Sequence, residues 1–507
     1  MFRRPAVVAG GVLLALSGGA LLPAAMAAGS GELPAERPES RTPPGAKVDA
    51  DADADSRPEP GPEPGPEPGP EPEGVWRTDG YGSLLAIKDG VLRKYQTTSV
   101  SCLKGETAKR SGQDAGSTTY TAPDGRGMTV RARTATSHRA RLHVDGSPGH
   151  QNMQRVRALP ADCTREAPAD PVATFDVFWQ TFQENYPFFA AKGVDWQAAR
   201  DRYRPAVDAG TTDDELFAVF RKMLEPLNDA HVSLTDGADR FFGETRPGTT
   251  MPSEALDTKV KKYVKERDLG GAELEEHANG RISYADLPGG QGYLRVSGFI
   301  GYSDGEHPDG RYAAEQAALD KALDDILTAD RTARLRGLIV DLRVNGGGAD
   351  ALGLRLASRL TDRTHFAYGK RARNHPEDPE RFTPEQPQYV KPARGVPRYA
   401  GPVAVLTGGS TVSAGESFTQ ALLDRPGRTV RIGEPTQGVF SDVLDRALPN
   451  GWEVGLPNEE FRTRDGRTFD GPGIPPDLAE PVFTEEEFEQ RRDSAFDRAV
   501  STLPGGS

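Results

Sequence analysis

The chain has 507 residues and a net charge of −13, with 27% charged and 36% hydrophobic side chains. This length allows two or three domains of about 100 to 200 residues each. Lysines and arginines form no continuous basic stripe, which argues against nucleic acid as a partner. Much of the acidity is local, because nine carboxylates between Asp49 and Glu73 stand against Arg57 alone.

Residues 1–27 have the pattern of a secretory signal peptide. Arg3 and Arg4 precede an apolar run over residues 6–22, and Ala25-Met26-Ala27 offers a small-residue cleavage site. No cysteine follows that site to take a lipid anchor, and no later stretch has about 18 consecutive apolar residues. We therefore expect a secreted (extracellular) and soluble protein without a membrane span.

Residues 28–74 predict a disordered linker. They are poor in apolar side chains and repeat Pro-Glu-Pro-Gly between Pro58 and Pro70. Proline stiffness and carboxylate repulsion keep such a segment extended, so it serves as a spacer.

Residues 75–165 predict a small antiparallel β-domain. Short alternating runs at 84–87, 91–95, 128–132 and 141–144 are separated by Asp-Gly turn pairs, the pattern of hairpins. Cys102 and Cys163 are expected to form a disulfide in an oxidising compartment, which would restrict the unfolded chain by roughly 4 kcal/mol. A catalytic thiol is the less favoured alternative, because neither cysteine lies beside a Gly-rich turn or a nearby histidine.

Residues 170–235 predict a helical subdomain, and residues 236–290 a polar connecting segment with one helical piece near 256–264. Two sets of apolar side chains recur at helical spacing, and for the aromatic set core packing is favoured over a ligand pocket. They are Phe175, Phe178, Trp179, Phe182 and Tyr186 on one face, and Leu216, Phe217, Phe220, Met223 and Leu224 on another.

Residues 291–485 alternate apolar strands with helices. This order predicts an α/β domain with a mainly parallel sheet covered on both sides, and places the chemistry beyond the carboxyl ends of its strands. Residues 486–507 predict a C-terminal helix and tail. Strands are expected at 293–296, 337–342, 403–406 and 429–432, and helices at 314–327, 352–360 and 417–423.

Ser413 is the candidate nucleophile. It follows the expected strand at 403–406 and precedes a helix, so its hydroxyl would be exposed beside the free amides of the first helical turn. The alternative is that Ser410, Ser413 and Ser417 are merely turn and N-cap residues.

A second glycine-rich turn follows the expected strand at 337–342. Gly346, Gly347 and Gly348 let backbone amides face outward without a side chain in the way. The Lys-Ser/Thr ending of a phosphate-binding loop is absent, which favours an oxyanion-binding role over nucleotide binding.

His231 is the candidate base. It ends the run Asn228-Asp229-Ala230-His231, directly after the last apolar face of the helical subdomain, whereas the other seven histidines lie in polar surroundings. A purely structural histidine is the alternative.

Four motifs occur in the order seen in the tail-specific, or C-terminal processing, serine peptidases, which the chain resembles over about residues 170–485. The resemblance implies a crotonase-like ββα spiral domain at 291–485 and hydrolysis of peptide bonds in peptide or protein substrates. The PDZ domain of many members is not evident in residues 236–290. The motifs are Asn228 to His231, Asp341 to Gly348, Val412 to Glu416 and Gly433 to Thr436.

The family has two catalytic styles. In the processing-protease branch a lysine follows Gly-Glu-Pro-Thr, but no lysine follows Lys391 here. The chain therefore resembles the tricorn-protease branch, in which a histidine is the base, and His231 matches that position. Ala230 departs from the glycine or serine that is commoner before the histidine.

The resemblance implies a role for each site residue. Ser413 would form an acyl-enzyme with His231 as general base, and the oxyanion would be held by the amides of Gly347 or Gly348 and of Ala414. The acceptor that orients the histidine would be Asp470, which stands where glutamate is more usual. Glu416 and Asp229 remain alternatives for that acceptor.

Other functions are weighed against this one. A catalytically silent binding protein of the same fold would tolerate loss of Ser413 or His231, and this chain has both. An α/β-hydrolase esterase requires Gly-x-Ser-x-Gly, but Thr411 occupies the first glycine position. The sequence indicates no cofactor and no metal site, since it lacks His-Glu-x-x-His and its two cysteines are far apart. It carries no signal for the oligomeric state.

Overall fold

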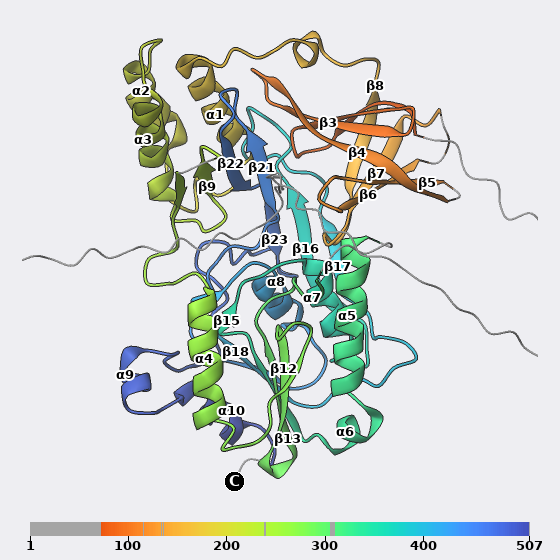
Figure 1. Cartoon of the computed structure of the whole chain (residues 1–507), viewed down its shortest axis with the longest axis vertical. Coiled ribbons are helices and arrows are strands. Elements are labelled where there is room, and N and C mark those ends of the chain that lie inside the picture. Colours follow the sequence, from red (N-terminus) through yellow and green to blue (C-terminus); the bar gives the residue numbers. More distant parts are fainter. Residues whose placement is uncertain are drawn as a thin grey trace, which may run out of the picture.

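A computed structural model of the chain describes residues 72–505, except 115, 133, 135, 238–239 and 305–309. The expected signal peptide (1–27) and nearly all of the expected linker (28–74) lie outside the described residues. Figure 1 shows a β-barrel and a group of helices at one end of the molecule, above a larger sheet flanked by helices.

Eight antiparallel strands form a closed barrel, coloured orange in Figure 1. Pairing of β1 with β8 closes the barrel, and Trp76, Leu92 and Tyr120 are buried in its core. The expected hairpins are present. Closure of the barrel was not predicted, because it depends on pairing between the first and last strands, which no local sequence pattern indicates. The strands are β1 (Gly74–Thr78), β2 (Ser83–Lys88), β3 (Val91–Thr97), β4 (Cys102–Asp114), β5 (Ser117–Thr121), β6 (Gly127–Ala132), β7 (Arg139–Val144) and β8 (Gln151–Val156).

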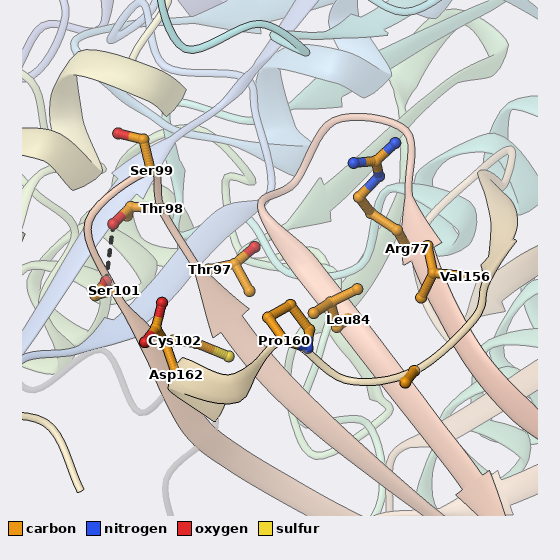
Figure 2. A pocket seen from close by; sticks show the side chains of 11 residues that line it. Arg77, Leu84, Thr97, Thr98, Ser99, Ser101, Cys102, Val156, Pro160 and Asp162 are labelled. Atoms are coloured by element: carbon orange, nitrogen blue, oxygen red, sulfur yellow. Dashed lines mark hydrogen bonds between the residues drawn. The ribbon is translucent and has the colours of Figure 1, made fainter. Parts of the chain in front are cut away.

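The disulfide between Cys102 and Cys163 is present, with the two Cα atoms 4.7 Å apart. Cys102 opens β4, and Cys163 lies in the short 3-10 helix η1 (Ala161–Thr164). The bond therefore ties the chain that leaves the barrel back onto it. A pocket of about 250 Å³ lies beside the disulfide, with Leu84 and Val156 among its lining residues (Figure 2).

Three helices with a common aromatic core follow the barrel. Asp170 caps the first helix, and Thr212 with Glu215 forms a capping box on the third. The Phe178 and Phe220 rings stack with centroids 3.9 Å apart, so the aromatic stripe is core, as predicted. The helices are α1 (Pro171–Asn185), α2 (Trp196–Tyr203) and α3 (Asp213–Leu224), and 3-10 helix η3 (Glu225–Leu227) follows.

A four-stranded sheet extends that core and joins distant parts of the chain. Its order is β10-β9-β22-β21, and Leu234 of β9 and Val454 of β22 pack on the aromatic helices. The strands are β9 (Ser233–Thr235), β10 (Phe241–Gly243), β21 (Val443–Ala447) and β22 (Glu453–Pro457).

The main sheet has seven strands in the order β11-β12-β13-β14-β18-β20-β24. From β13 onward the neighbours are parallel, as expected, but β11 and β12 add an antiparallel hairpin at one edge. The sheet thus begins at Glu275, within the segment that was expected to be a connection. The prediction missed this hairpin because polar residues such as Ser283, which is buried in β12, are typical of loops. The strands are β11 (Glu275–His277), β12 (Ile282–Leu287), β13 (Gln291–Val296), β14 (Gly337–Asp341), β18 (Val403–Thr407), β20 (Thr429–Gly433) and β24 (Leu478–Ala479).

Helices cover both faces of this sheet. Successive residues of β14 alternate between them: Leu338 packs with Phe418 of α8, and Ile339 with Val260 of α4. No helix within the described ranges is long and apolar enough to cross a bilayer. The helices are α4 (Glu254–Arg267), α5 (Arg311–Ile326), α6 (Ala329–Arg334), α7 (Asp350–Ser358), α8 (Ala414–Ala421), α9 (Glu485–Glu489) and α10 (Ser494–Thr502).

Two smaller pairings complete the architecture beyond the main sheet. The short parallel pair β15–β19 joins the segments that follow β14 and β18. A three-stranded sheet has the order β17-β16-β23. The strands are β15 (Val344–Asn345), β16 (His365–Ala372), β17 (Gln386–Val390), β19 (Ser410–Thr411) and β23 (Glu459–Arg462).

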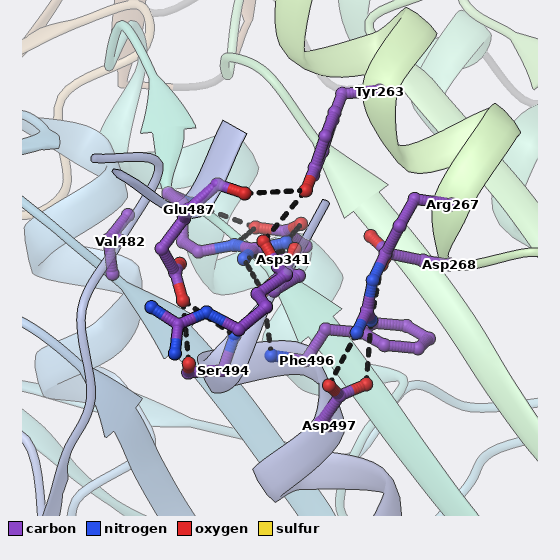
Figure 3. A network of polar contacts seen from close by, with 12 residues as sticks. Tyr263, Arg267, Asp268, Asp341, Val482, Glu487, Ser494, Phe496 and Asp497 are labelled. Carbon is purple, nitrogen blue, oxygen red and sulfur yellow. Dashed lines mark hydrogen bonds and ion pairs between the residues drawn. The ribbon is translucent and has the colours of Figure 1, made fainter. Parts of the chain in front are cut away.

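A buried ionic network anchors the chain just before the triple glycine. The Arg343 guanidinium is fully buried and pairs with Asp341 at 2.7 Å and with Asp493, the N-cap of α10, at 2.6 Å. Arg267 of α4 binds Asp497 of α10 at 2.5 Å in the same region (Figure 3). Because removing one partner of a buried pair leaves a costly uncompensated charge, the network fixes the turn that follows β14.

Candidate active site

Ser413 stands at the N-cap of α8 in a backbone conformation that serine rarely adopts, with φ 55° and ψ −118°. Such a conformation costs about 1–3 kcal/mol and occurs preferentially at functional sites. The hydroxyls of Ser410 and Ser417 donate to Thr250 O and Asp350 Oδ1, whereas Ser413 forms a capping box with Glu416 at the start of α8. All three serines thus make turn or cap contacts, and Ser413 differs from the other two by its positive φ.

Glu416 holds the Ser413 turn in place. Its fully buried carboxylate accepts from the amides of Gly438 at 2.6 Å, Val439 at 2.9 Å and Ser413 at 3.1 Å. Burial raises the pKa of Glu416 to about 7, although these amides and the Thr436 side chain act in the opposite direction. These contacts join the serine turn to residues 436–439, and none of them is with the histidine.

The triple glycine lies directly against Ser413. The β15–β19 pair brings the two turns together, and a Cβ atom on Gly347 would lie 2.6 Å from Ser413 Cβ. The Gly347 amide donates to Asn345 Oδ1 at 2.9 Å, whereas the amides of Gly348 and Ala414 find no acceptor within the described part of the chain. Of the two glycines expected to hold an oxyanion, Gly348 is therefore the one with a free amide.

Alanine substitutions in the triple glycine test whether activity depends on the close approach of Gly347 to Ser413 or only on the presence of three glycines. Gly347→Ala places a methyl group against Ser413 at positive φ, and we expect activity to fall by about tenfold or more. Gly346→Ala is the matched control, because its nearest atom would be Pro252 Cβ at 4.0 Å, and should stay within about twofold. Steady-state kinetics checks this, and equal activities of the two variants would contradict it.

His231 lies in a tight turn between η3 and β9. Asp229 caps the turn by accepting the His231 amide at 3.0 Å, and its other oxygen accepts the Tyr186 hydroxyl at 2.9 Å. The imidazole is 6% exposed, and its Nδ1 has no hydrogen-bond partner in the described ranges. Burial lowers the pKa of His231, while Asp229, Asp442 and the Ser441 backbone act in the opposite direction.

The segment that follows the Gly-Glu-Pro-Thr motif connects the serine turn to the histidine. Val439 O accepts the Ser413 amide at 3.1 Å. Further along the same segment, the Ser441 backbone and the Asp442 charge both favour the imidazolium form of His231. Hence Ser413 and His231, far apart in sequence, flank one short stretch of chain.

Asp470 does not bind His231. Its carboxylate accepts from the Thr468 hydroxyl at 2.6 Å and the Phe440 amide at 3.2 Å. Its pKa is raised well above the usual value, chiefly by burial, which favours the neutral acid. The expected acceptor role of Asp470 therefore has no contact to support it. Besides Asp229, the carboxylate whose charge favours the His231 imidazolium is Asp442, which the sequence analysis missed.

Family models match two stretches of the chain. Peptidase family S41 matches residues 290–479, and the Tricorn protease C1 domain matches residues 168–225. The larger match places the similarity to peptidase family S41 in the domain built on the main sheet. The chain is a serine-type peptidase with a multidomain α/β protease fold, and Ser413 and Gly348 lie inside the first match. His231 lies between the two matches.

Several solved structures are similar to the chain, whereas no curated protein matches it. A predicted peptidase from Parabacteroides merdae ATCC 43184 is 26% identical with a TM-score of 0.54, over 66% of this chain and 97% of that chain. The photosystem II D1 C-terminal processing protease is 17% identical with a TM-score of 0.38, over 62% and 94%. The tricorn protease is 15% identical with a TM-score of 0.33, over 83% and 45%.

Proposed function

We propose that this serine-type peptidase is exported and cleaves peptide bonds through an acyl-enzyme, with Ser413 as nucleophile and His231 as general base on a crotonase-like domain. The observation that carries the proposal is the Ser413 turn, where a serine at positive φ stands beside the free amides of Gly348 and Ala414. The signal pattern in residues 1–27 and the Cys102–Cys163 disulfide support export.

The reaction takes place in two halves. His231 removes the hydroxyl proton as Ser413 attacks the peptide carbonyl, and the amides of Gly348 and Ala414 stabilise the oxyanion. The imidazolium then gives its proton to the leaving amine, which leaves an acyl-serine. Water, deprotonated by the same imidazole, attacks that ester and releases the acid.

Labelling with a fluorophosphonate tests the proposal. We expect one adduct, on the peptide that contains Ser413, because only an activated serine reacts readily with this reagent. Digestion and mass spectrometry locate the adduct. A folded protein that stays unlabelled would contradict the proposal and support a catalytically silent binding protein, and an adduct on another serine would remove Ser413.

A further inference from the structure

Two side chains from different parts of the fold hold the Asp442 carboxylate in place. Lys370 Nζ of β16 lies 3.1 Å from Asp442 Oδ2, and the Ser147 hydroxyl donates to the same oxygen at 2.6 Å. Lys370 also donates to Ser147 Oγ at 2.8 Å. Because Ser147 follows β7, the barrel contributes directly to this triangle of contacts.

The barrel loop that carries Ser147 is fixed on both sides. Gly146 O accepts the Ala351 amide of α7 at 3.0 Å. The His150 amide donates to Gln386 Oε1 at 3.1 Å, and the Gln386 side chain returns a bond to His150 O at 2.6 Å. These contacts with α7 and β17 fix the loop and therefore the direction of the Ser147 hydroxyl.

The surrounding charges leave Asp442 as the ionised partner of Lys370. Lys370 is also 3.1 Å from Glu459 of β23, which accepts the Tyr81 hydroxyl of the barrel at 2.5 Å. Burial raises the pKa values of Glu459 and of Asp350 in α7, which favours their neutral forms. Burial also opposes ionisation of Asp442, but Lys370, Ser147 and His231 together hold its pKa below the usual value.

Sheet geometry puts Asp442 and His231 at the same edge. Strands β9 and β21 both pair antiparallel with β22, so they run in the same direction. His231 lies two residues before β9 and Asp442 one residue before β21. Each of these two side chains favours the charged form of the other.

We propose that Asp442 is a positioning residue that acts on His231 through its charge and stabilises the imidazolium, and that Ser147 of the barrel, with Lys370, holds Asp442 for this role. The barrel is then a structural part of the catalytic unit. This inference rests on the proposed function, because it acts through His231 as the base. The other carboxylates are engaged elsewhere: Glu416 on the serine turn, Asp470 on Thr468 and Phe440, and Asp229 on Tyr186 and the His231 backbone.

The test is the pH profile of kcat and KM for variants of the full chain. Asp442→Asn should lower kcat by about tenfold or more at nearly constant KM. It should also move the acidic limb of kcat/KM to lower pH, because a negative charge that favours the imidazolium is lost. Ser147→Ala should lower kcat by roughly threefold to tenfold, Ser147→Thr should restore it, and Ser137→Ala, in another barrel loop, should have no effect.

Two outcomes separate this inference from the proposed function. Unchanged kcat and an unchanged acidic limb in Asp442→Asn and Ser147→Ala, with His231→Ala inactive, would overturn the positioning role and leave the function intact. So would an Asp229→Asn variant that alone shifts the limb. An active His231→Ala would remove the function itself. If Asp442→Asn fails to fold in a thermal melt, the Ser147→Ala and Ser147→Thr pair decides.

Discussion

Replacing Ser413 with alanine is expected to lower kcat by about a thousandfold or more while leaving the thermal midpoint nearly unchanged. Activity is lost because the hydroxyl is the atom that bonds to the acyl group. Stability is kept because the Ser413 backbone amide, which holds the turn, still donates to Glu416 and to Val439 O. The strain at φ 55° is the same for alanine as for serine.

The control for Ser413→Ala is Ser410→Ala, three residues earlier on β19. Ser410 donates its hydroxyl to Thr250 O at 2.6 Å, so it serves the loop and not the reaction. We expect its kcat to stay within about threefold of the parent value. Turnover by Ser413→Ala close to that of Ser410→Ala would exclude Ser413 as the nucleophile.

The local part of the site could be predicted because its signals are contiguous. An apolar strand, small turn residues and a helix follow one another around Ser413, and a second strand runs into Gly346. Parallel strands bring such turns to one edge, so Ser413 and Gly348 could be placed together before the fold was known. The strands and helices expected between 291 and 485 correspond to β13, β14, β18, β20, α5, α7 and α8.

The missed elements depend on partners far away in the chain. Strand β12 pairs with β11 and β13 and buries Ser283. Its polar residues gave no strand pattern in the sequence. Strand β16 pairs with β23 across about ninety residues, and the barrel closes through β1 and β8. The hydrophobic period of a single sequence can indicate a strand but not the strand with which it pairs, so these pairings could not be predicted.

The carboxylate partner of His231 could not be predicted for the same reason, because it depends on residues far away in the chain. Asp470 matched a motif position, but Thr468 and Phe440 occupy its oxygens. Asp442 follows no recognisable motif, and its place at the same sheet edge as His231 arises from the shared strand β22 and from Ser147 of the barrel. Chemistry predicted the kind of group required, and only tertiary structure identified which one.

His231→Ala should lower kcat/KM by about a hundredfold or more, because the serine then loses the base that accepts its proton. The matched control is His138→Ala, at an exposed position in the barrel, and its kcat/KM should be unchanged.

The pH profile of the parent enzyme adds a second readout. The base works only when neutral, and burial lowers the pKa of His231 below its ordinary value of 6.5. The neutral imidazole therefore persists to lower pH, and the acidic limb of kcat/KM should have its midpoint below about 6.5. A midpoint above that value, or an alanine variant with parental kcat/KM, would assign the proton transfer to another group.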